Sequence, residues 1–328
     1  MNRPTTKHGF LSYPGVLDAF GHGGDLSYGF SLDFAIVPEM RFGYVLLTNV
    51  AGELHLRPTV QELLLGSPEP PMAGSNLPDA QAVEGRFITA RRMEGDFLEF
   101  MSYAGLTGNT MAQVSALDEN TIQFSFGAIG SAVYIQTAPY VFQVYAGADA
   151  TMLSRFIPEL RFLMENGTPV QIITANGMDF TAMPTGRTMP FLIASIVSVV
   201  LSVVFFLVAP IVLFVMFLIR RKKQPLRTRF DRFSTGFLLS GTLLTLSNLV
   251  LFGLFGINPF RTIAEVSPFI WINYVLSGLT ALLFAGSIFS WRTLGEARTK
   301  RKALFMVTSV IAAKLIVLLW HWNFFVIL

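Results

Sequence analysis

The residues of this chain best suited to chemistry lie near its amino terminus, in the stretch Phe20-Gly-His-Gly-Gly-Asp25. Three glycines surround His22 there, and Leu17–Gly24 is predicted to form a strand. Glycines leave the backbone of a strand bare, which suits a strand edge that lies against a substrate. A simpler interpretation is that His22 is a turn residue hydrogen-bonded to Asp25. These residues alone leave both interpretations open.

The elements that would position this strand follow it directly. Phe30–Val37 and Phe42–Asn49 are apolar, and we expect an antiparallel pair joined at Pro38–Arg41. Apolar residues recur through Ala51–Leu65, which predicts a closing helix. The expected order is therefore strand, strand, strand, helix.

The block from Gly21 to Gly52 resembles the final active-site segment of the β-lactamase-like serine hydrolases and penicillin-binding proteins. In that family a Lys-Thr-Gly or His-x-Gly triplet lies on an inner strand of the catalytic groove, and His22-Gly23-Gly24 matches the triplet. The resemblance implies the C-terminal part of an α/β hydrolase domain over residues 1–66. It also implies that His22, Gly23 and Gly24 line the groove and that the backbone just after them borders the oxyanion hole.

The same resemblance implies acyl transfer through a serine ester, with peptides, β-lactams or small esters as substrates. The family places a Ser-x-x-Lys nucleophile motif before the triplet, but this sequence contains no Ser-x-x-Lys, and no Tyr-x-Asn or Ser-x-Asn precedes His22. We therefore expect the C-terminal part of a membrane-bound serine hydrolase, so whether this chain is itself an enzyme stays open. The alternative is a non-catalytic, membrane-anchored protein that derives from the family and binds a ligand or partner.

The composition excludes several other kinds of site. The chain has no cysteine, so disulfides, thiolate metal sites and cysteine nucleophiles are excluded. Its 4 histidines show no close pairing and no carboxylate at ligand spacing, so neither zinc nor another cofactor is expected. Residues 1–188 hold 10 Lys and Arg against 18 Asp and Glu, while residues 189–328 hold 14 against 3. The net charge of +3 is thus a sum of two opposite halves and does not indicate a nucleic-acid partner.

The second half of the chain is predicted to span a lipid bilayer. Each of its four apolar runs exceeds the roughly 20 residues that a helix needs to cross the hydrocarbon core. The runs are Phe191–Ile219, Phe237–Ile257, Pro268–Trp291 and Ala303–Leu328. Lys314 lies within the last run and is expected to face a polar groove between helices or to reach towards an interface.

The loops between these runs predict the orientation. Residues 220–232 hold 7 basic residues and residues 292–302 hold 5, and basic loops are retained in the cytoplasm. The N-terminal domains and the C-terminus would then lie outside a bacterial inner membrane. Export normally needs an apolar signal segment, and Met1–Phe10 has none, so we expect additional sequence upstream.

A separate β domain is predicted between these two parts. Residues 67–82 are rich in proline and small residues, which predicts a linker. Short segments of alternating polarity fill residues 83–185, and Asn166-Gly167 and Asn176-Gly177 are strong hairpin signals. Six to eight antiparallel strands of this kind predict a small barrel or sandwich.

The two ends of this middle domain carry a second resemblance. Its opening Gly-x-Phe and its closing Met-Asp-Phe-Thr-Ala-Met-Pro resemble the lipocalin-like domain that often follows the catalytic domain in this hydrolase group. Five phenylalanines of the domain are expected in its core rather than in a binding stripe: Phe97, Phe100, Phe124, Phe126 and Phe142.

Overall fold

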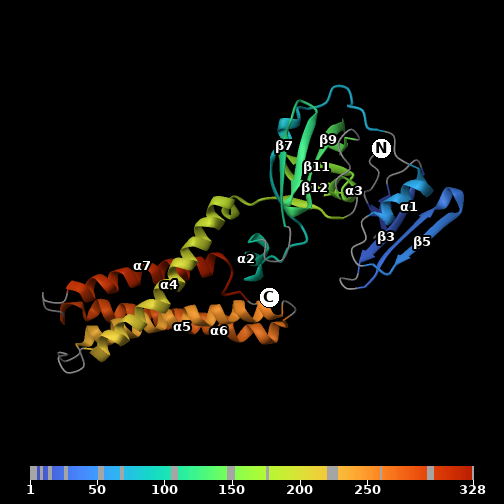
Figure 1. Cartoon of the computed structure of the whole chain (residues 1–328). Helices are drawn as coiled ribbons and strands as arrows, with labels where there is room; N and C mark the ends of the chain where they lie inside the picture. The colour runs from blue at the N-terminus through green and yellow to red at the C-terminus, as the bar shows by residue number, and fades with distance from the viewer. Residues whose placement is uncertain are drawn as a thin grey trace. The chain divides into compact units, whose positions relative to one another are not determined.

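The structure is a computed structural model (Figure 1). It describes residues 6–7, 10–13, 17–25, 29–50, 55–66, 70–104, 110–145, 152–174, 177–219, 228–258, 261–293 and 299–326. The chain separates into two compact units. The first comprises Met1–Arg92 with Gly105–Thr185, and the second comprises Met93–Ala104 with Gly186–Leu328.

The first unit begins with a five-stranded antiparallel sheet whose strands lie in chain order. The strands are β1 (Thr6–Lys7), β2 (Phe10–Tyr13), β3 (Ala19–Asp25), β4 (Ser31–Val37) and β5 (Phe42–Thr48). Helix α1 (Leu56–Leu65) follows, so the predicted order of three strands and a helix is confirmed. Strands β1 and β2 were not predicted from the sequence. Residues 51–54 of the predicted helix lie outside the described residues, as does His8, one of the 4 histidines that were not expected to bind a metal.

This sheet is covered on one face. Burial alternates along β4, as expected for a strand that buries every second side chain. Ala35 and Val37 of β4 pack with Ala19 of β3 and Leu65 of α1 in a small core. The side chains of the alternate positions point to the opposite face.

Eight antiparallel strands close the second part of this unit into a barrel, which decides between the predicted barrel and sandwich. They are β6 (Gly85–Thr89), β7 (Met111–Ala116), β8 (Thr121–Phe126), β9 (Gly130–Ala138), β10 (Val141–Val144), β11 (Glu159–Glu165), β12 (Thr168–Thr174) and β13 (Phe180–Ala182). Asn166 and Gly167 have φ of 49° and 77°, so the predicted hairpin turn joins β11 to β12. Asn176 and part of the predicted linker, residues 67–69, lie outside the described residues.

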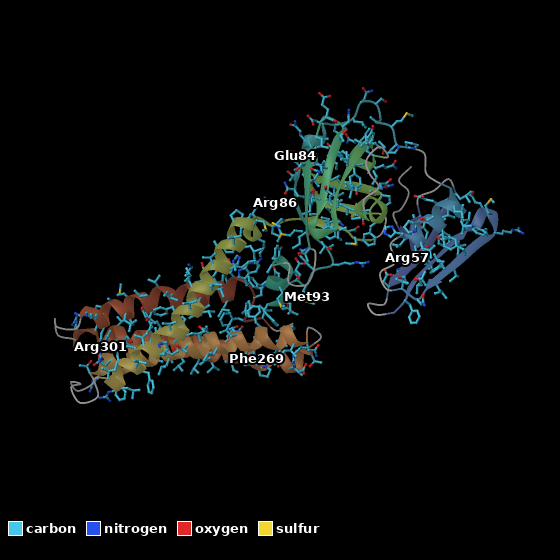
Figure 2. All side chains as sticks on the ribbon, in the orientation of Figure 1. Arg57, Glu84, Arg86, Met93, Phe269 and Arg301 are labelled. Carbon is cyan, nitrogen blue, oxygen red and sulfur yellow. The ribbon has the colours of Figure 1, made fainter. Side chains whose placement is uncertain are left out.

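The second unit contains four helices that are long and apolar enough to cross a membrane. They are α4 (Met189–Ile219), α5 (Arg229–Ile257), α6 (Ile263–Phe289) and α7 (Thr299–His321). Asp231 caps the start of α5 and forms an ion pair with Arg301 of α7. Figure 2 labels Arg301. Helix α7 ends at His321 although the apolar run continues, because Asn323 has φ of 60° and the chain turns there. Most of the two basic loops, residues 220–227 and 294–298, is not described.

A short helix, α2 (Leu98–Tyr103), lies between β6 and β7 in sequence but belongs to the helical unit. Phe124, Phe126 and Phe142 lie in the barrel core as predicted. The prediction was wrong for Phe97 and Phe100, which pack among the residues of the helical unit. The reason is local: the Asp96 side chain accepts a hydrogen bond from the Leu98 N–H and starts a helix. This helix is then held in the helical unit, where Glu99 pairs with Arg187.

Candidate functional site

The triplet predicted to do chemistry lies on β3, between β2 and β4. His22 is exposed and lies opposite Phe34 of β4, on the sheet face that α1 does not cover. The carboxylate of Asp25 pairs with Arg57 of α1 at 3.1 Å, and no described hydrogen bond joins it to His22. Figure 2 labels Arg57. The structure therefore places the histidine as an accessible strand residue and not as a turn residue held by Asp25.

Packing restricts the three glycine positions around His22 to different degrees. A Cβ at Gly21 would lie 1.7 Å from the carbonyl oxygen of Phe34, so packing alone requires glycine there. A Cβ at Gly23 would approach its nearest neighbours at 3.4 Å, and one at Gly24 would approach Leu32 at 3.7 Å. Both are ordinary van der Waals distances, so packing does not explain Gly23 or Gly24. Their effect is a bare backbone directly beside an exposed histidine.

The sheet face around His22 is apolar and exposed. The register of β4 and β5 pairs Leu32 with Leu47 and Phe34 with Val45, and it places all four side chains on this face. Val45 and Leu47 are each 72% exposed, and Leu32 is 39% exposed. A contiguous exposed apolar patch on a soluble domain marks a surface for another protein segment or for a ligand.

The covered face holds a polar group that was not predicted from the sequence. Asp33 is 4% exposed and accepts hydrogen bonds from the hydroxyls of Tyr13 and Tyr44, the latter at 2.7 Å. Burial, together with the hydrogen bond to Asp33, raises the pKa of both tyrosines, so their hydroxyls stay protonated. This group ties β2, β4 and β5 together beneath the triplet. The sequence did carry one signal for this group: Asp33 occupies an inward-facing position of a strand whose side chains alternate between buried and exposed.

The sheet does not contain a complete catalytic set. Ser31 is buried and its hydroxyl donates to the carbonyl oxygen of Val50 at 2.8 Å, so it is not available as a nucleophile. Over the described part of the chain, no group of three or more His, Asp or Glu residues could hold a metal ion. The residues around His22 place an imidazole and a bare backbone on an accessible face, and these groups cannot by themselves form an acyl-enzyme.

A second polar cluster occurs in the helical unit, around a buried carboxylate. Glu99 of α2 is 8% exposed, and its Oε1 accepts from Nε of Arg187 at 3.0 Å. Its Oε2 accepts from Nδ2 of Asn323 at 2.7 Å and from the Gly95 N–H at 3.3 Å. The Arg187 guanidinium also stands 4.2 Å from the centre of the Trp322 ring, within cation–π range. Because Arg187 and Asn323 are 88 and 224 positions from Glu99, no sequence pattern links them.

Two asparagines join the helices of the same unit. Asn248 of α5 and Asn273 of α6 exchange hydrogen bonds of 2.8 and 3.2 Å, and Asn273 also donates to the carbonyl oxygen of Phe324 at 3.0 Å. Side-chain amides often join helices across a membrane in this way. Lys314, which we expected in a polar groove or near an interface, is exposed on the surface of α7.

Comparisons with known proteins do not assign a family. No known family matches the chain, and no curated protein matches it. A crystal structure of SurE with D-Leu is similar to 53% of the chain at 16% sequence identity, with a TM-score of 0.31. The chain spans 37% of that SurE chain. A likeness of this extent carries no argument about fold or function.

Proposed function

We propose that this protein is part of a membrane-bound serine hydrolase of the β-lactamase and penicillin-binding-protein type. The bare backbone at Gly23 and Gly24 beside the exposed His22 is the observation that carries this proposal, because packing does not require either glycine. In this role, the strand lines the groove that binds a peptide, β-lactam or ester. His22 donates a hydrogen bond to the substrate, and the serine nucleophile comes from a segment other than residues 1–328.

The four apolar helices support attachment to a bilayer. We propose a bacterial inner membrane, with residues 220–232 and 292–302 in the cytoplasm, because basic loops stay on that side. The sheet, the barrel and the C-terminus would then face outward, where cell-wall peptides and β-lactams occur. In this arrangement the barrel is the lipocalin-like domain of the proposed hydrolase.

The test uses the protein isolated from its own membranes through a C-terminal affinity tag, together with any further polypeptide segment that is isolated with it. A fluorescent penicillin and a fluorescent fluorophosphonate ester are the probes, since each acylates or phosphonylates an active serine. We expect labelling of the isolated species, and a loss of at least about tenfold in labelling rate for His22→Ala, because removing one positioned donor commonly costs that much or more.

A matched control is His55→Ala. His55 is another exposed histidine of this unit, and its side chain does not cap α1. The control should label like the unaltered protein. The proposal is wrong if neither probe labels the isolated species, or if His22→Ala and His55→Ala label equally fast.

The second candidate is a non-catalytic protein that binds a partner through the exposed apolar face, and the exposure of Val45 and Leu47 favours it. Since the chain has no cysteine, Val45→Cys provides a unique thiol on this face. Leu63→Cys is the control, because Leu63 of α1 is 81% exposed. Slow maleimide labelling at position 45 but fast labelling at 63 in native membranes, without labelling by the serine probes, would favour this binding role.

A further inference from the structure

One end of the helical unit brings together the start of α5, the end of α6 and the start of α7. Phe230 of α5 packs against Trp291, which follows α6, and against Phe305 of α7, with ring centres 5.5 and 5.4 Å apart. Asp231 of α5 pairs there with Arg301 of α7, and Figure 2 shows Arg301 at this end of the helices. These contacts place the charged residues of three helices side by side.

The charges at this end are almost all positive. Asp231 is the one acidic residue in the described part of this end, and it is buried against Arg301. Arg261, beyond the other end of α5, pairs with Glu265, so charge there is offset. Five further basic residues at the first end have no carboxylate partner in the described part of the chain: Arg229, Arg232, Arg292, Lys300 and Lys302. All but Lys302 are exposed. An exposed group of cations without carboxylates indicates an anionic partner.

The depth of these residues matches the surface of a bilayer. Arg229 begins α5, and Lys300 and Lys302 lie in the first turn of α7, and both helices are long and apolar enough to span a membrane. Trp291 follows α6, and tryptophan is enriched where the hydrocarbon meets the headgroups. The Lys302 ammonium lies 5.5 Å from the centre of the Trp291 ring, so this cation stands at the same level. In a bilayer, the phosphates of the headgroups are therefore the anions nearest to this end.

We propose that this end of the helical unit binds the headgroup of an anionic phospholipid. Arg292, next to Trp291 in the chain, and Lys302, over its ring, contact the lipid phosphate, and the other three cations add attraction from α5 and α7. A zwitterionic lipid is disfavoured, because the cation of its headgroup is repelled by the same residues. The proposal depends neither on the hydrolase role of the triplet on β3 nor on which side of the membrane this end faces.

The experiment uses the full chain in detergent micelles, with phosphatidylglycerol and phosphatidylcholine of equal acyl chains as probes. Native mass spectrometry gives the dissociation constant of the first bound lipid. A Lys or Arg near an anionic lipid surface contributes about fivefold to binding, so two contribute about 25-fold. We expect phosphatidylglycerol to bind at least about 25-fold more tightly than phosphatidylcholine. The double variant Arg292→Gln with Lys302→Gln should lose about this factor for phosphatidylglycerol only.

A matched control removes two cations elsewhere in the same unit. Arg261→Gln with Lys314→Gln should bind phosphatidylglycerol like the unaltered protein, because Arg261 is paired with Glu265 and Lys314 lies midway along α7. Arg292→Lys with Lys302→Arg keeps both charges and should also bind normally. Raising the salt concentration should weaken phosphatidylglycerol binding to the unaltered protein, which keeps the proposal testable if the glutamine pair does not fold.

Several results would overturn the proposal. Equal affinity for the two lipids would mean that the cations do not select a headgroup. Equal phosphatidylglycerol binding by the glutamine pair and the control pair would mean that the site lies elsewhere. Displacement of the lipid by inorganic phosphate would assign the cations to free phosphate, and tighter binding of a short RNA would assign them to nucleic acid.

Discussion

Replacing Glu99 by alanine should release α2 from the helices that hold it. The side chains of Glu99 and Arg187 are only 10% and 13% exposed, so their ion pair is largely shielded from water. Without the carboxylate, the Arg187 guanidinium and the Asn323 amide both lose their acceptor. Breaking a buried pair from one side costs about 3–5 kcal/mol. Because Arg187 still stacks on Trp322, we take the lower value, which corresponds to roughly a 100-fold increase in the undocked population of α2.

The absence of cysteine provides a direct assay for this opening. Ser102 of α2 is 1% exposed, so the thiol of a Ser102→Cys variant should react slowly with a maleimide while α2 is docked. Labelling of a group that is reached only by local opening follows the open population when opening and closing are fast. We therefore expect Glu99→Ala to speed labelling by roughly 100-fold in that background. Glu94→Ala is the control, because Glu94 is exposed in the segment just before α2.

Two outcomes would refute the reasoning. A labelling rate that rises by less than about threefold would mean that the ion pair contributes under 1 kcal/mol to docking. The double variant Glu99→Met with Arg187→Met should label more slowly than Glu99→Ala, because it leaves no unpaired buried charge. If the double variant labels as fast as the single one, the loss of the carboxylate is not acting through Arg187.

Three further predictions concern packing, helix pairing and pH. Gly241→Ala should lower the thermal midpoint in detergent, because the added Cβ would lie 2.4 Å from a buried phenylalanine ring and such overpacking costs about 1–3 kcal/mol. Gly253→Ala is the control and should leave the midpoint unchanged, because a Cβ there would meet nothing within 4 Å. Asn273→Leu should destabilise the helical unit by about 1 kcal/mol in the same assay, and an unchanged midpoint would contradict a structural role for the amide pair. The raised pKa values of Tyr13 and Tyr44 mean that their contribution to sheet stability is complete below the unfolded value of about 10 and declines as pH rises above it. The tyrosinate absorbance that a Tyr13→Phe, Tyr44→Phe double variant lacks should therefore appear only together with loss of the sheet, and its appearance in a folded sheet near pH 10 would contradict this.

Much of the fold follows from local sequence patterns. A helix that crosses a membrane must be apolar along its whole length, so composition was enough to find α4 to α7. Alternating polarity and turn residues such as Asn166-Gly167 were enough to find most strands of the barrel. These features depend on neighbours within a few positions in the chain. The triplet was also found without tertiary information, because glycines beside a histidine in a predicted strand are unusual.

Contacts between distant residues could not be predicted from the sequence. Nothing in the segment Met93–Ala104 indicates that it packs with helices that begin nearly a hundred residues later. The pairing of Glu99 with Arg187 and Asn323, the burial of Asp33 and the position of the buried Trp322 donor all depend on where the chain folds back. The sequence by itself therefore determined the four long apolar helices, most of the strands and the position of the triplet. Only the tertiary structure decided which polar groups are buried, because burial depends on every element packed around a side chain.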